Sequence, residues 1–223
     1  MLDKELKRKG LQFVRYADDF SIYAKSKVEA KKIGNEVYLF LKNKLALPIN
    51  RDKSGIRRPS TFEVLGHAFV PTYKKGEKGK YQLIVKKGSW LNLKRKLKQL
   101  TKKTKPYSFE YRLLKLKQVW QGWVNNYRLA SIQLKLKSLD EWLRNRLRYC
   151  IWHDWKKLER KRKNLMLLGI ENGQAYAWSR TRMRGWAVAQ SPILKTTITI
   201  SRLKQKGYQT MVDYYLQRLP QIS

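Results

Sequence analysis

Residues 13–23 read Phe13-Val14-Arg15-Tyr16-Ala17-Asp18-Asp19-Phe20-Ser21-Ile22-Tyr23. Aromatic and β-branched side chains on both sides of the two aspartates favour pleated strands. Ala17, Asp18 and Asp19 are compact enough to form the turn between two such strands. The stretch therefore predicts a β-hairpin with both carboxylates at its tip.

The two carboxylates at this tip have two possible roles. Asp is a common turn residue, so Asp18 and Asp19 can simply form the turn. Alternatively, two uncompensated carboxylates that repel each other can share divalent cations. A pair of metal ions held by aspartates lowers the pKa of an attacking 3′ hydroxyl and neutralises the charge on the departing pyrophosphate, which is the chemistry of nucleotide addition.

The residues around the aspartates favour the second role. Residues 16–19 resemble the Tyr-Ala-Asp-Asp motif of reverse transcriptases, and the Phe-Val-Arg before it and Phe-Ser-Ile after it are most similar to the group II intron branch of that family. The resemblance implies that Asp18 and Asp19 are catalytic ligands of Mg²⁺. It also implies that Tyr16 and Ala17 lie beside the bound nucleotide and primer.

A second motif of the same family follows the hairpin. Residues 47–54 read Leu-Pro-Ile-Asn-Arg-Asp-Lys-Ser and resemble the family's Leu-x-Leu-Asn-x-x-Lys-Thr segment, with Pro48 and Ser54 as departures. The resemblance implies that Lys53 lies near the incoming triphosphate. Without the motif, a single Lys among 51 basic residues is an ordinary solvated side chain.

Residues 62–69 alternate in polarity like a strand. Gly66 would permit another backbone to approach closely, or would mark a bulge in an ordinary strand. The segment resembles the Phe-x-x-Leu-Gly primer grip of reverse transcriptases. That resemblance implies that Phe62, Leu65 and Gly66 bind the primer end.

The charge of the chain is its largest compositional bias. It has 51 Lys and Arg against 16 Asp and Glu, a net charge of +35, and most of the excess lies after residue 85. We therefore expect polyanionic partners. The resemblance implies that these are group II intron RNA and an RNA/DNA template-primer. No apolar run approaches the roughly 18 residues of a membrane-spanning helix, so no membrane partner is expected. Cys150, the single cysteine, is expected in a helix core and is typical of a reducing, cytoplasmic location in bacteria.

Helical periodicity and turn signals predict an α+β fold. A helix over residues 2–9 precedes the hairpin, a second over 27–46 follows a Ser26 capping box, and residues 81–85 form a returning strand. Composition changes near residue 86. We expect a small antiparallel sheet in residues 1–85 and an all-α bundle in residues 86–223. The resemblance implies that residues 1–85 are a partial reverse-transcriptase palm and that residues 86–223 are a thumb/maturase bundle that binds RNA.

Three apolar stripes at helical spacing predict the helices of this bundle. They begin at Trp90, Leu113 and Leu136, and the third is expected to continue to Leu158. The tryptophans are expected mainly in the core, with base stacking as the minor alternative. Basic side chains on the outer faces are predicted to bind RNA, although each one alone is equally well explained as solvated surface. These residues are Lys94, Arg95, Lys98, Arg112, Lys115, Arg128, Arg144, Arg148, Lys156 and Arg160.

Several segments of this second part resemble the group II intron maturase domain, also called domain X or the thumb. Residues 118–128 are similar to its Arg-Gly-Trp-x-x-Tyr-Tyr segment, with Gln121 and Asn126 as departures. Further similar segments are residues 139–144, 146–155, 184–186 and 191–194.

These resemblances imply the C-terminal part of a group II intron-encoded RNA-directed DNA polymerase/maturase. Such an enzyme needs a further palm aspartate and the fingers, which no stretch before Tyr16 supplies. We therefore expect that this chain alone does not polymerise. It would be either the C-terminal half of a split enzyme that docks on a separate N-terminal fingers/palm chain, or the remnant of a broken reading frame. The alternative is a non-catalytic maturase-type RNA-binding module that assists intron splicing. A general basic nucleic-acid protein would leave the Tyr-Ala-Asp-Asp motif unexplained.

Overall fold

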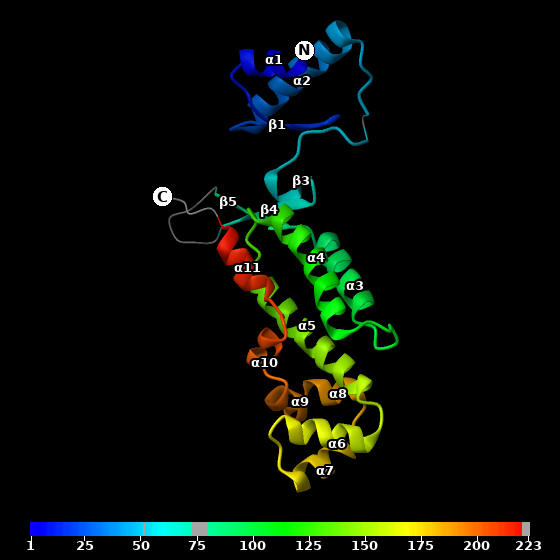
Figure 1. Cartoon of the computed structure of the whole chain (residues 1–223). Coiled ribbons are helices and arrows are strands. Elements are labelled where there is room, and N and C mark those ends of the chain that lie inside the picture. The colour runs from blue at the N-terminus through cyan, green and yellow to red at the C-terminus, as the bar shows by residue number, and fades with distance from the viewer. Residues whose placement is uncertain (51, 73–79, 220–223) are drawn as a thin grey trace. The chain divides into compact units, whose positions relative to one another are not determined.

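The computed structural model describes residues 1–50, 52–72 and 80–219 (Figure 1). It confirms the predicted α+β class, with small antiparallel sheets followed by a helical bundle. Two compact units are present, Met1–Phe62 and Glu63–Ser223. The composition change at residue 86 lies after the strands of the second unit, and the division into palm and thumb at that residue stays a prediction.

Unit 1 packs a hairpin against two helices. Its elements are α1 (Leu2–Arg8), β1 (Gln12–Tyr16), β2 (Asp19–Tyr23), α2 (Lys27–Leu45) and the short 3-10 helix η1 (Pro59–Thr61). The predicted hairpin is confirmed, because Tyr16 pairs with Asp19 across a two-residue turn. One face of the hairpin, with Phe13, Phe20 and Ile22, packs on apolar side chains of both helices.

Helix α2 begins and ends at local signals. The Ser26 hydroxyl accepts a hydrogen bond from the Glu29 backbone N–H at 3.1 Å, as the capping box predicts. The Glu29 carboxylate accepts in return from the Lys25 N–H at 2.8 Å, one residue before the expected donor. The helix ends at Leu45, and the next residue, Ala46, has a left-handed φ of 50°. The helical conformation is disfavoured for a residue that precedes a proline, so the helix stops before Pro48.

Unit 2 begins with a three-stranded antiparallel sheet of β3 (Glu63–Val64), β4 (His67–Pro71) and β5 (Tyr81–Val85). The expectation of one strand over residues 62–69 is wrong. Leu65 and Gly66 have φ values of 49° and 78° and form a two-residue hairpin turn, because two consecutive positive φ angles match the twist of the paired strands. The predicted loop over residues 73–80 lies, except for Lys80, outside the described residues.

Nine helices follow in the described part of unit 2. They are α3 (Lys87–Leu100), α4 (Phe109–Tyr127), α5 (Gln133–Asp154), α6 (Leu158–Leu167), α7 (Asn172–Ser179), α8 (Gly185–Gln190), α9 (Pro192–Thr197), α10 (Ile200–Gln205) and α11 (Met211–Arg218). The predicted cap Ser108 accepts from the Tyr111 N–H at 3.2 Å at the start of α4. Ser191 stands at the N-cap position of α9, but its hydroxyl donates to the Val188 carbonyl at 2.8 Å and does not cap the helix; Pro192 occupies the first position of α9.

The third predicted helix does not continue to Leu158. Helix α5 ends at Asp154, and Lys156 takes a φ of 44°, which no α-helix accommodates. The break lets Trp155 contact Trp152 with ring centroids 5.7 Å apart, and it directs α6 onto α7. The apolar period therefore belongs to two helices with separate partners.

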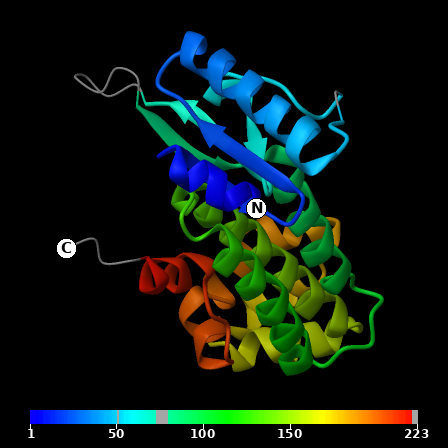
Figure 2. The same cartoon turned by 90° about the horizontal axis from the view of Figure 1, so that it is seen from above.

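The core of unit 2 lies between its longer helices. Helices α3, α4 and α5 run side by side, α11 lies against α4 and α5, and α8 packs on α5 (Figures 1 and 2). Trp120, Leu147 and Cys150 are buried between them, as their positions on the apolar stripes predicted. Among the described helices, none combines the length and apolar character needed to span a membrane.

Candidate nucleic-acid interface

The hairpin tip presents its carboxylates to solvent. Tyr16, which is 66% exposed, and Asp19 face away from the helices, since they alternate with Phe13, Arg15 and Phe20 on the packed face. Asp18 and Asp19 are both exposed, and within the described chain neither carboxylate has a hydrogen bond or an ion pair. Both oxygen-donor groups are therefore available on the open face.

The backbone of the tip is held in an unusual conformation. Ala17 has a φ of 51°, which is unfavourable for a residue with a Cβ. Arg15 stabilises it, because its Nε donates to the Ala17 carbonyl at 2.9 Å while its Nη1 pairs with Asp3 at 2.9 Å. The two aspartates consequently project from a turn that is fixed to α1.

Two adjacent carboxylates would supply only part of the ligands of a magnesium ion. They are hard oxygen donors of the kind that Mg²⁺ binds, but an octahedral ion takes further ligands from water, substrate or another carboxylate. Among the described residues there is no group of three or more His, Cys, Asp or Glu side chains placed to hold a metal. Asp18 and Asp19 thus fit an incomplete site, and Mg²⁺ binding there stays a prediction.

Lys53 follows a turn made by the motif's asparagine. The Asn50 side-chain oxygen accepts from the backbone N–H groups of Asp52 and Lys53 at 3.0 and 3.3 Å. This local ring fixes the chain direction, and Lys53 is exposed at its end. Its predicted contact with a triphosphate remains untested.

A glycine is required at position 66 because residues far away in the sequence pack against it. A Cβ built there would lie 2.4 Å from the Tyr127 hydroxyl and 3.1 Å from Ser89 Oγ. Tyr127 donates to Ser89 at 3.1 Å, and the Gly66 carbonyl accepts from the Lys86 N–H at 2.9 Å. The turn is therefore held against the start of α3 and the end of α4, and no local signal reveals this.

The other two primer-grip candidates differ in exposure. Leu65 is exposed at the tip of the β3–β4 hairpin, while Phe62 is partly buried. Leu65 and Gly66 lie together in the same turn. Their predicted contact with a primer stays a prediction.

Most of the predicted RNA-binding residues lie on the surface of unit 2. Lys94, Arg95, Lys98, Arg128, Lys156 and Arg160 are exposed, and Lys115 and Arg144 are partly exposed. Aromatic rings accompany some of these cations: Lys94 Nζ lies 5.2 Å from the Trp142 ring centroid, and Lys115 Nζ lies 5.4 Å from that of Tyr111. Cations beside aromatic rings are typical of surfaces that bind nucleic acid.

Two predicted RNA-binding arginines are corrected by the structure. Arg112 is 1% exposed, and its guanidinium donates to the carbonyls of Leu100, Lys102 and Lys105 and to Cys150 Sγ. Arg148 is 6% exposed, donates to the Ile198 carbonyl at 3.0 Å, and burial lowers its pKa. Both guanidinium groups are buried and donate to backbone carbonyls that are shielded from water and need donors, so they hold segments together rather than contact RNA.

Two structural residues escaped the sequence analysis. Arg146 Nη2 donates to the Thr101 carbonyl at 2.6 Å, which fixes the end of α3. Asp140 is 2% exposed and accepts from the Tyr208 hydroxyl and from the backbone N–H groups of Met211 and Val212. Burial raises the pKa of Asp140, while these hydrogen bonds oppose the rise. The polar position of Asp140 beside an apolar stripe was the only available signal.

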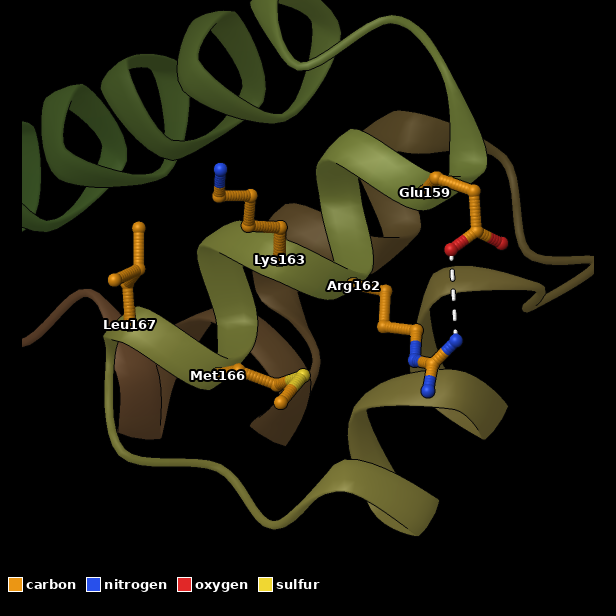
Figure 3. A pocket seen from close by; sticks show the side chains of 5 residues that line it. All are labelled: Glu159, Arg162, Lys163, Met166 and Leu167. Carbon is orange, nitrogen blue, oxygen red and sulfur yellow. Dashed lines mark ion pairs between the residues drawn. The ribbon is translucent and has the colours of Figure 1, made fainter.

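Helix α6 adds further basic side chains to this surface. Figure 3 shows a shallow depression on it lined by Glu159, Arg162, Lys163, Met166 and Leu167. Glu159 pairs with Arg162 at 3.5 Å and with Arg180 at 2.9 Å. Within the described part of the chain, Lys156, Arg160 and Lys163 have no acidic partner and remain available for phosphates.

Comparison with known families agrees with this surface. Residues 91–168 match the family model described as "Group II intron, maturase-specific domain", and no curated protein matches the chain. The matched region begins in α3 and continues past the end of α6, so it contains the exposed cations of α3 and α6. Unit 2 of this chain therefore carries a region similar to the maturase-specific domain of group II introns.

Proposed function

We propose that this chain binds group II intron RNA through the helices of unit 2 and assists intron splicing as a maturase. The observation that supports the proposal is the match over residues 91–168 to helices whose exposed lysines and arginines have no acidic partner among the described residues. Binding of this kind releases counterions from the RNA. Its affinity is expected to fall about a thousandfold or more between 50 and 200 mM salt if six or more phosphates are contacted.

The test is binding of the full chain to a folded group II intron RNA over a salt series. Charge reversal at Lys94, Arg95 and Lys98 is expected to weaken binding by at least about tenfold and to reduce the salt slope by about three contacts. The matched control is Asp18→Asn with Asp19→Asn, which changes charge in unit 1 and is expected to preserve binding. Absence of binding, or an affinity unchanged by the α3 reversal, would contradict the proposal.

A second candidate function is a contribution to RNA-directed DNA synthesis. It is favoured by the two exposed carboxylates at the tip of the hairpin, in a Tyr-Ala-Asp-Asp sequence, which have no ion-pair partner in the described part of the chain. Asp18 and Asp19 would supply two ligands for Mg²⁺, which orients the 3′ hydroxyl and neutralises developing charge when bound. A fingers/palm chain would supply the remaining ligand and the template clamp.

The test of this second function adds Mg²⁺, a primed RNA template, nucleotides and a fingers/palm chain to the full protein. Extension of the primer is expected with the natural sequence and is expected to be lost with Asp18→Ala. Lys53→Ala is expected to raise the nucleotide KM. Extension that survives Asp18→Ala would refute the role of the hairpin.

A further inference from the structure

A cluster of cations and aromatic rings in unit 2 is not used by the surface described above. Lys103 from the α3–α4 loop, Arg146 and Tyr149 from α5, and Trp186 from α8 come together. The Tyr149 and Trp186 rings meet edge to face with centroids 5.9 Å apart, and Arg146 Cζ lies 5.6 Å from each centroid. Lys103 Nζ lies 5.9 Å from the Tyr149 ring. Lys103 is exposed and the other three are partly exposed.

The loop that carries Lys103 is fixed on both sides. Arg146 Nε donates to Thr101 Oγ1 at 3.1 Å, in addition to its hydrogen bond to the Thr101 carbonyl. Arg112 donates to the carbonyls of Lys102 and Lys105, which flank Lys103. Two arginines therefore hold the backbone around Lys103. Neither arginine has an ion-pair partner among the described residues. A preorganised cation binds an anion with less loss of conformational entropy.

The Tyr149 and Trp186 rings are also held in place by packing. A Cβ built at Gly185 would lie 3.1 Å from Tyr149 Cε2, a tight contact that a larger residue could make only if the Tyr149 ring shifted by a few tenths of an ångström. Trp186 follows directly and lies against Tyr149. The glycine thus permits the contact that brings the indole to the cluster.

The chemistry of the cluster matches a single nucleotide. An aromatic face stacks on a base, and neighbouring cations bind the attached phosphate. In an RNA duplex the base faces are covered by neighbouring base pairs, so rings can stack only on an unpaired base. The structured RNA of the proposed function would supply such bases in its loops and bulges.

We propose that Lys103, Arg146, Tyr149 and Trp186 form a subsite for one unpaired nucleotide of the bound RNA. The base stacks on the Trp186 ring, Lys103 binds its phosphate, and the Tyr149 ring, nearly perpendicular to the indole at 87°, holds the indole edge to face. The subsite rests on the proposed RNA-binding function and adds a preference for unpaired segments. Trp186 lies beyond the residues that match the maturase-specific domain.

The test compares two RNAs with equal numbers of phosphates, a hairpin with an unpaired adenosine loop and a blunt duplex. Trp186→Leu removes the ring but keeps an apolar side chain. It is expected to weaken hairpin binding about 5- to 100-fold, the range of one lost base stack, and to change duplex binding less than about twofold. Trp186→Phe, which keeps a ring, is expected to retain most of the hairpin preference.

A spectroscopic measurement reports stacking directly. With 2-aminopurine in the hairpin loop, the natural protein is expected to quench its fluorescence, and Trp186→Leu is expected to lose this quenching. Tyr176→Leu is the matched control, because Tyr176 is also exposed with a cation over its ring, Arg180 Cζ at 3.7 Å, but lacks a clamped lysine loop. It is expected to leave the preference for the hairpin unchanged.

The possible results distinguish failure of the subsite from failure of the proposed RNA-binding function. Equal losses for hairpin and duplex, or quenching that persists in Trp186→Leu, would overturn the subsite while leaving general RNA binding intact. No binding of either RNA by the natural chain would instead refute the proposed function. If Trp186→Leu no longer melts cooperatively, Lys103→Ala decides: it is expected to lower the salt slope for the hairpin by about one contact and to leave that for the duplex unchanged. If Lys103→Ala lowered the salt slope equally for the two RNAs, the subsite would be overturned.

Discussion

The buried carboxylate of Asp140 is predicted to hold α11 on α5. It accepts three hydrogen bonds, from the Tyr208 hydroxyl and the Met211 N–H at 3.0 Å each and from the Val212 N–H at 3.1 Å. Asp140→Ala would leave these three donors without an acceptor, and loss of a buried network of this kind costs about 3–5 kcal/mol of unfolding free energy. For a unit of this size, the melting temperature is expected to fall on the order of 10 °C.

A conservative substitution separates charge from shape. In Asp140→Asn, the side-chain oxygen can still accept from Tyr208 and Met211, but the amide N–H₂ faces the Val212 N–H. One charge-assisted hydrogen bond is lost, so the expected cost is about 1–3 kcal/mol. The matched control is Glu141→Gln, because Glu141 is the exposed neighbouring carboxylate on α5 and is expected to change stability by less than about 0.5 kcal/mol.

The effect of pH has a defined sign. Burial raises the pKa of Asp140 in the folded protein, so the folded state holds this proton more tightly than the unfolded chain. Its contribution to stability is largest below the unfolded pKa and is lost as the pH rises through the folded pKa. The stability of the natural protein minus that of Asp140→Asn is therefore expected to decrease as pH rises above about 4.

The assay is urea unfolding over a pH series, with amide hydrogen exchange of α11. Faster exchange confined to α11 and the adjoining segment would locate the lost contact. The reasoning would be refuted if Asp140→Ala unfolded at the same urea concentration as the natural protein. It would also be refuted if the difference between the natural protein and Asp140→Asn were independent of pH.

Three further predictions concern backbone and buried charge. Gly66→Ala is expected to cost about 2–4 kcal/mol, since its Cβ would overlap the Tyr127 hydroxyl at a positive φ, and urea unfolding of a double variant with Tyr127→Phe should recover part of this loss. Ala17→Gly is expected to raise stability by up to about 1 kcal/mol by relieving the φ of 51°, whereas Ala17→Val should lower it; thermal melts with both variants check the sign. Arg112→Met is expected to lower the free energy of unfolding by about 3–5 kcal/mol, because carbonyls of the α3–α4 loop lose their donors. Amide hydrogen exchange should then increase in residues 101–108. Unchanged exchange there would contradict the role of Arg112 in holding this loop.

Local rules explain how much of the fold the sequence predicted. The hairpin at Tyr16–Asp19, the Ser26 cap of α2 and the start of α9 at Pro192 depend on residues within a few positions of one another. The strand expected over residues 62–69 failed because alternation in polarity continues through a two-residue turn. The helix expected up to Leu158 failed because the apolar period resumes after the break at Lys156.

The candidate site, like the fold, was predicted only in part from the sequence. Composition and helical spacing were sufficient to predict a cationic helical surface, because charge and periodicity are properties of the chain itself. They did not distinguish Arg95, which is exposed, from Arg112, whose guanidinium is enclosed by carbonyls of another segment. That distinction belongs to the packing of α4 against the α3–α4 loop.

The amino-acid sequence by itself determined the element types, the acidic hairpin tip and the excess of positive charge, since each arises from neighbouring residues or from a sum over the chain. Only the tertiary structure decided that Asp140 holds α11, that Gly66 makes room for Tyr127, and that Tyr149 meets Trp186. The physical reason is that burial and hydrogen bonding depend on the atoms brought close in space. Those partners lie 37 to 72 positions away along the chain.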